Sequence, residues 1–104
     1  MPRNQFQTLS EPMYYVLLTL TEECSGVDIM SKVADISERR VVVGPGTVYA
    51  MLDKFLKNKV IRETECQGRK RSYIITDYGK KLLKAEFNRA QILFLDGKRI
   101  MEEI

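Results

Sequence analysis

Two strand-like segments flank a basic, glycine-containing loop in the second half of this chain. Residues 60–65 and 72–76 are rich in β-branched and apolar side chains, and residues 67–71 between them read Gln-Gly-Arg-Lys-Arg. This arrangement is typical of a β-hairpin. A single hairpin buries too little apolar surface to be stable alone. The segments around it must therefore supply most of the core.

Three helical patterns precede the hairpin, each with apolar residues along one face. The first begins at Ser10-Glu11-Pro12, where serine can cap the helix and proline is tolerated in the first turn. The second starts at Ser25-Gly26 and fades at the charged residues 38–40. The third begins at residues 44–47 and ends near 58–59. Its expected buried face consists of Val48, Met51, Leu52, Phe55 and Leu56.

The remaining segments complete a recognisable order of elements. Three valines at 41–43 predict a short edge strand before the third helix. After the hairpin, a long helix is expected from Thr76-Asp77 to residue 104. Because Asp96-Gly97 interrupts the helical pattern, its last turn or two is expected to bend or fray. The order predicts a mainly α fold with a small β-hairpin wing (α+β), a winged helix-turn-helix. We expect residues 1–76 to form this domain and residues 77–104 a C-terminal dimerisation helix, in one compact unit.

Charge is concentrated in the middle of the chain. Residues 54–84 carry ten basic and three acidic side chains, whereas the whole chain has a net charge of +3. A basic region in a near-neutral chain is typical of a phosphate-binding surface. A solvated, lysine-rich surface explains the charge alone equally well.

The third helix and the loop of the hairpin are the candidate contacts with nucleic acid. The major groove of DNA, about 12 Å wide, admits one α-helix, and the second helix of the turn motif enters it with its N-terminal residues first. The basic loop suits phosphate or a narrow minor groove. Alternatively, residues 44–46 merely turn the chain and the loop is a solvated turn. The residues expected to face DNA are Pro45, Gly46, Thr47, Tyr49, Ala50 and Lys54 on the helix, and Arg69, Lys70 and Arg71 in the loop.

The tail carries an apolar seam with heptad spacing. Its members lie alternately four and three residues apart, as in helices that pair along a common face. The seam predicts a homodimer whose two recognition helices lie roughly 34–36 Å apart, as successive major grooves require. The alternative is that the helix folds back on its own domain. The seam consists of Leu83, Phe87, Ala90, Phe94, Gly97, Met101 and Ile104.

Several other functions are disfavoured by the residues present. The chain has no histidine, and its two cysteines, Cys24 and Cys66, lack metal-site spacing. We therefore expect no metal and no cofactor. The sequence also lacks a nucleophile–base pair, so we expect no enzyme activity. Reduced thiols are expected, with a redox link between the cysteines as the alternative. The chain shows no signal peptide and no apolar stretch long enough to span a membrane. We therefore expect a cytoplasmic protein without membrane partners.

The motifs at residues 44–52 and 68–76, together with Gly79, resemble the PadR family of bacterial transcriptional regulators. Residues 11–18 and 25–30 are similar to the first two helices of that family, so the resemblance covers about residues 9–85. It implies a dimeric repressor of a palindromic operator in double-stranded DNA, often relieved by a small-molecule effector. It also implies that Thr47 and Tyr49 lie at the DNA face and that Arg69 and Arg71 serve the wing.

Two features depart from the pattern of that family. Many members have proline where this chain has Lys70, which implies a more flexible wing. The chain also lacks tryptophan, although some relatives bind flat aromatic drugs between tryptophans at the dimer centre. A winged helix that docks on proteins, without sequence-specific DNA binding, is the alternative function. The basic region argues against it.

Overall fold

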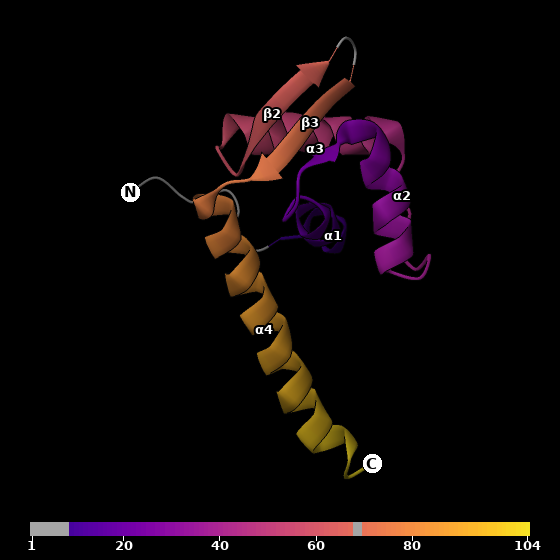
Figure 1. Cartoon of the computed structure of the whole chain (residues 1–104). Helices are drawn as coiled ribbons and strands as arrows, with labels where there is room; N and C mark the ends of the chain where they lie inside the picture. Colours follow the sequence, from indigo (N-terminus) through magenta and orange to yellow (C-terminus); the bar gives the residue numbers. More distant parts are fainter. Residues whose placement is uncertain (1–8, 68–69) are drawn as a thin grey trace.

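The computed structural model describes residues 9–67 and 70–104, which form a helical domain with a small antiparallel sheet and one projecting helix (Figure 1). The winged helix-turn-helix fold predicted from the sequence is confirmed. The elements are α1 (Glu11–Thr19), β1 (Cys24–Ser25), α2 (Gly26–Ile36), α3 (Pro45–Lys57), β2 (Ile61–Gln67), β3 (Lys70–Ile75) and α4 (Asp77–Met101).

Hydroxyl side chains cap three of these helices, as expected from the sequence. The Ser10 hydroxyl accepts the Met13 amide N–H at 3.3 Å and begins α1. Ser25 begins α2 in the same way, and the Thr76 hydroxyl accepts the Gly79 N–H at 3.1 Å to begin α4. Each cap satisfies an amide that the helix itself leaves unpaired.

Helix α3 ends in a tight turn that returns the chain to the core. Lys59 has a left-handed φ of 60°, which lets the Val60 N–H donate to the Phe55 carbonyl at 2.9 Å. The Lys59 N–H donates to the Leu56 carbonyl at 3.1 Å. This pair of bonds is the Schellman motif, in which glycine usually occupies the left-handed position. Helix α2 ends with Glu38 in a similar conformation, at a φ of 53°.

The sheet has the strand order β1-β3-β2. Strands β2 and β3 form the predicted hairpin, with Ile61 opposite Ile75 and an irregularity between Glu63 and Glu65. Strand β1 pairs with the other edge of β3, where Cys24 lies opposite Tyr73. This two-residue strand was not predicted.

The prediction of a strand at residues 41–43 is wrong. The segment is an irregular loop in which Val41 and Val43 are buried, at 8% and 7% exposure, while Val42 is 74% exposed. The edge of β3 that a third strand could join is occupied by β1. The loop is held instead by core packing of the two valines and by the Val41 N–H, which donates to the Ser37 hydroxyl at 3.0 Å.

The core lies between the three helices of the domain and the inner face of the sheet. Helix α1 lies between α2 and the first turns of α4 and packs against both (Figure 1). The predicted face of α3 is confirmed, because Val48, Leu52 and Phe55 are buried and its other two members are partly buried. The largest fully buried side chains are Phe55, Leu17, Leu20, Ile29, Leu52, Val16, Val33, Val48 and Val60.

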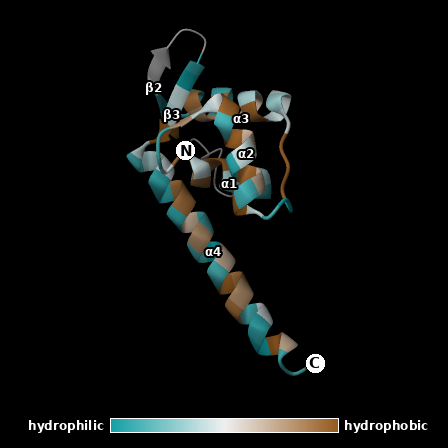
Figure 2. Cartoon of the chain, turned by 45° about the vertical axis from the view of Figure 1, so that its right-hand side comes forward, coloured by the Kyte–Doolittle hydropathy of each residue, from teal (hydrophilic) through white to brown (hydrophobic). Residues whose placement is uncertain are grey.

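Helix α4 leaves the domain after its first ten residues (Figures 1 and 2). Gly79, Leu83 and Glu86 are its buried residues, and from 87 onward every residue is exposed except the half-buried Gly97. The helix passes through Asp96-Gly97 without a break, so the predicted bend is wrong. It ends at Met101, three residues before the expected end at 104. The alternative that this helix folds back on its own domain is also wrong. Within the described residues, no helix is long and apolar enough to cross a bilayer.

The start of the predicted seam needs one correction. Leu83 is 8% exposed and belongs to the core of its own domain, because the first turns of α4 pack against α1 and β3. The seam that remains exposed begins at Phe87. Its large members are well exposed: Phe87 at 56%, Phe94 at 65% and Met101 at 67%.

Candidate nucleic-acid interface

The N-terminal end of α3 is open to solvent. Gly44 caps the helix in an extended conformation without a side-chain hydrogen bond, and Pro45 occupies the first turn. Pro45, Gly46 and Thr47 are exposed, and a Cβ added at Gly44 or Gly46 would meet no atom within 4 Å. Unpaired backbone N–H groups and the positive end of the helix dipole therefore face outward, which suits a phosphate.

One flank of α3 faces the start of α1. Thr47, Ala50 and Lys54 border a largely apolar hollow of about 310 Å³ there, together with Ser10 and Met13. All three α3 residues are exposed, and exposure is what the sequence led us to expect of residues that face DNA.

The other flank of α3 faces the wing. Tyr49 and Asp53 border a hollow of about 250 Å³ with Arg71 and Tyr73 of β3 and with Gly26-Val27 at the start of α2. The structure thus brings the predicted residues Tyr49 and Arg71 to one hollow. It places Thr47 and Lys54 on the opposite flank.

The cationic start of β3 is partly neutralised from within the wing. Lys70 and Arg71 are exposed, and the Arg71 Nε lies 3.9 Å from the Glu63 Oε1 on β2. Both partners are solvent-accessible, so the attraction between them is weak. Burial raises the pKa of Tyr73, which lies opposite Glu63 in the register, and the Glu63 carboxylate adds to that rise. Arg69 lies outside the described residues.

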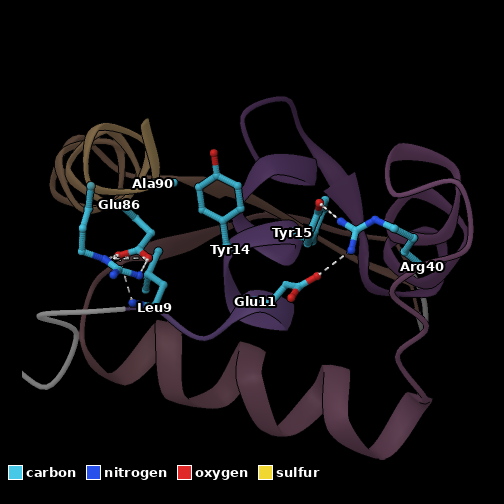
Figure 3. Close-up of a pocket in the computed structure, with 8 residues that line it drawn as sticks. Leu9, Glu11, Tyr14, Tyr15, Arg40, Glu86 and Ala90 are labelled. Atoms are coloured by element: carbon cyan, nitrogen blue, oxygen red, sulfur yellow. Dashed lines mark hydrogen bonds and ion pairs between the residues drawn. The ribbon is translucent and has the colours of Figure 1, made fainter. Parts of the chain in front are cut away.

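A third hollow, of about 360 Å³, lies between α1 and α4 (Figure 3). Two charged pairs line it. The Arg40 guanidinium contacts the Glu11 carboxylate at 3.2 Å and donates to the Tyr15 hydroxyl at 2.8 Å. On the α4 side, the Arg89 Nε donates to Glu86 at 3.2 Å.

Glu86 is the most buried charged group of this third hollow. Its carboxylate accepts the Leu9 backbone N–H at 3.4 Å in addition to the bonds from Arg89. The hydrogen bonds from Arg89 lower the pKa of Glu86, against the opposing effect of desolvation. The carboxylate therefore stays ionised and ties the start of the described chain to α4.

Residues 16–85 match the family model of the PadR-like transcriptional regulators. The chain belongs to the PadR-like family. The predicted family and the predicted class, a regulator of transcription that binds DNA, are thereby confirmed. PadR-like proteins are regulators rather than enzymes, in agreement with the expectation from the sequence.

Solved structures agree with this PadR-like fold. A PadR family regulator from Eggerthella lenta has 18% identity and a TM-score of 0.74, covering 88% of this chain and 81% of that one. RosR from H. salinarum has 19% identity and a TM-score of 0.71, covering 91% and 88%. Bacillus subtilis PadR in complex with operator DNA has 28% identity and a TM-score of 0.63, covering 72% of this chain and 45% of that one. No curated protein matches the sequence.

Sequence reasoning did not single out three residues that lie beside the candidate site of this PadR-like protein. Asp53 follows Tyr49 by one helical turn, and that spacing could have placed both on one face of the helix. Glu63 lies opposite Tyr73 and 3.9 Å from Arg71, which is two residues along the same strand, so a known strand register would have placed it near that cation. Gly26 was expected only to start the second helix, because its position next to Tyr49 depends on the packing of α2 against α3.

Proposed function

We propose that the protein is a homodimeric repressor that reads a palindromic operator in double-stranded DNA. The observation that carries this proposal is that the open end of α3 and the cationic start of β3 belong to one surface. Tyr49 and Arg71 border the same hollow. A helix that enters the major groove would thus bring the wing against the flanking backbone.

The start of α3 supplies the base-reading part of this surface. Pro45, Gly46 and Thr47 enter the groove first, with Tyr49, Ala50 and Lys54 on the two flanks. The glycines allow the backbone to approach the DNA because they carry no side chain. The Thr47 and Tyr49 hydroxyls and the Lys54 ammonium can each donate to a base edge or a phosphate.

The exposed seam on α4 supplies the dimer. Phe87, Ala90, Phe94 and Met101 lie on one face of α4, and all four are exposed. Each large apolar side chain contributes roughly 1.5–3 kcal/mol when fully buried. A second copy of α4 is the natural partner, because the repeat of four and three residues is self-complementary. Pairing there sets the distance between the two α3 helices.

A small-molecule effector would act through the hollow between α1 and α4. Tyr14 and Tyr15 offer aromatic surface there, and the ion pairs of Arg40 and Arg89 offer polar contacts (Figure 3). A molecule that separates α1 from α4 would change the angle at which α4 leaves the domain. The spacing of the two α3 helices, and with it the affinity for the operator, would change accordingly.

Salt dependence separates this function from docking on a protein. We expect the logarithm of the DNA association constant to fall linearly with the logarithm of salt concentration, with a slope of about −0.9 per neutralised phosphate. Fluorescence anisotropy with a labelled duplex gives that slope. DNA binding that is absent at low salt, or that is insensitive to salt, would favour the protein-docking module.

The wing is expected to contribute non-specific affinity. The double substitution Lys70→Ala and Arg71→Ala should weaken binding to every duplex and reduce the magnitude of the salt slope by up to about 1.8, since two phosphate contacts are lost. Substituting Lys32→Ala, an exposed lysine of α2, is the matched control and should leave the slope unchanged. A slope equal to that of the wild type in the double variant would exclude the wing as a phosphate contact.

Glu63 is expected to oppose DNA binding. The substitution Glu63→Gln removes a carboxylate 3.9 Å from the Arg71 Nε and leaves that guanidinium to the phosphates. Exposed ion pairs contribute about 1 kcal/mol at most, so we expect DNA to bind about two- to fivefold more tightly. Anisotropy titrations at low salt measure this change. Weaker binding by the variant would mean that Glu63 holds Arg71 in its DNA-contacting position.

A further inference from the structure

Tyr49 lies with one edge of its ring against the first residue of α2. The side chain is 44% exposed. A Cβ added at Gly26 would stand 3.1 Å from the Tyr49 Cε1 and 3.4 Å from its hydroxyl oxygen. It would also stand 3.5 Å from a methyl of Leu52, which is an ordinary van der Waals distance. The Tyr49 ring therefore occupies part of the space that any side chain at position 26 would need.

The backbone of Gly26 does not itself require glycine. Gly26 is the first residue of α2 and has no left-handed φ, so any amino acid could adopt its conformation. What glycine supplies here is the missing side chain. Gly44 and Gly46 make a useful contrast, because a Cβ at either would meet nothing within 4 Å.

The Tyr49 ring also borders the open hollow shared with the wing, and Gly26 lies at the rim of the same hollow. Val27, Asp53 and Arg71 surround that hollow, and the buried Tyr73 forms part of its lining. The start of α2 therefore lies beside the far end of the ring. On the side of the hollow, the ring has room to swing.

We propose that Gly26 is a positioning residue for DNA recognition, because it lets the Tyr49 ring lie close against the start of α2. The Tyr49 hydroxyl is thereby presented beside α2, at the edge of the surface that α3 turns toward DNA. This inference rests on the proposed function, in which Tyr49 contacts DNA. In this inference, Gly26 makes no contact with DNA itself but determines the position of the Tyr49 hydroxyl, which does.

A methyl group at position 26 should move Tyr49 rather than unfold the domain. The tight contacts fall on the far end of a half-exposed side chain, which can rotate into the hollow. Gly26→Ala is therefore expected to fold normally, with the Tyr49 hydroxyl displaced. Loss of that contact should weaken binding about tenfold, the scale of one lost contact with a base or phosphate.

A double-mutant cycle tests the inference. Affinities of the wild type, Gly26→Ala, Tyr49→Ala and the double variant are measured by anisotropy on a duplex selected from random DNA, and thermal unfolding is recorded for each. We expect Gly26→Ala to cost about tenfold in the presence of Tyr49 and less than about twofold in its absence. Tyr49→Phe keeps the ring carbon that crowds position 26 but lacks the hydroxyl, so in that background Gly26→Ala should cost less than about twofold. Proton NMR of the free protein should show ring-shifted Gly26 α-protons in the wild type and Tyr49→Phe, but not in Tyr49→Ala.

The outcomes separate the two proposals. If the wild type prefers its selected duplex and Gly26→Ala binds it equally well, the positioning role is wrong and the proposed function stands. The same holds if Gly26→Ala weakens binding equally with and without Tyr49, since the effect would then not pass through the ring. If the wild type prefers no duplex, the proposed function fails and the positioning role falls with it.

Discussion

Replacing Phe94 with aspartate is expected to convert the dimer into a monomer and to weaken operator binding by more than about a hundredfold. Phe94 is 65% exposed in the single chain, so the substitution leaves the core of the domain intact. In the dimer the same position would bury a carboxylate without a partner, which costs several kcal/mol. A monomer also presents one α3 helix where the operator requires two.

Analytical ultracentrifugation over a range of concentrations measures the dimer, and anisotropy measures the affinity for DNA. Asn88→Asp is the matched control, because it adds the same charge to an exposed position away from the seam on the same helix. We expect that variant to remain dimeric. A dimer of Phe94→Asp with the stability of the wild type would mean that the exposed seam is not the dimer interface.

Replacing Gly79 with alanine is expected to give the largest loss of stability among the glycine substitutions. A Cβ at this position would lie 2.2 Å from the Val60 carbonyl oxygen and 2.6 Å from a side-chain carbon of Ile75. That carbonyl cannot move freely, because it accepts the Thr76 N–H at 3.0 Å and the Thr76 hydroxyl at 2.9 Å. We expect a loss of about 3 kcal/mol, at the upper end for overpacked sites.

Urea unfolding followed by circular dichroism measures the free energy of unfolding of the Gly79→Ala variant. A loss of this size lowers the melting temperature by more than about 10 °C in a domain of this length. Gly46→Ala is the matched control, because it adds the same methyl group to a helical glycine outside the seam, where nothing lies within 4 Å. It should be neutral or stabilising, given the helix propensity of alanine. Equal stabilities of the two variants would contradict the close approach of α4 to Val60.

Local signals made much of the fold predictable. The caps at Ser10 and Thr76 and the hairpin around residues 67–71 depend on neighbours within a few residues. Strand β1 has no such signal, because Cys24 and Ser25 form a strand only through the free edge of β3. The valines at 41–43 were misassigned for the same reason. Strand propensity acts only where a partner strand is available.

The candidate site was predicted in part. The exposed residues of α3 follow from helical spacing, since the apolar face must turn inward. Gly26 and Glu63 act through contacts between elements far apart in sequence, and spacing along one element cannot find those. The heptad repeat also placed Leu83 in the seam, whereas the crossing of α4 over α1 buries it in its own domain. Periodicity identifies an apolar face but not what covers it.

Selection of bound sequences from a pool of random double-stranded DNA tests the central claim most directly. A dimer that reads DNA with two symmetric α3 helices should enrich an inverted repeat whose half-sites lie about 10 base pairs apart, centre to centre, or a multiple of that spacing. The purified wild type should then bind the recovered duplex far more tightly than a scrambled one at the same salt concentration. A pool that shows no enriched sequence, or one without two-fold symmetry, would contradict the proposed dimeric operator-binding function.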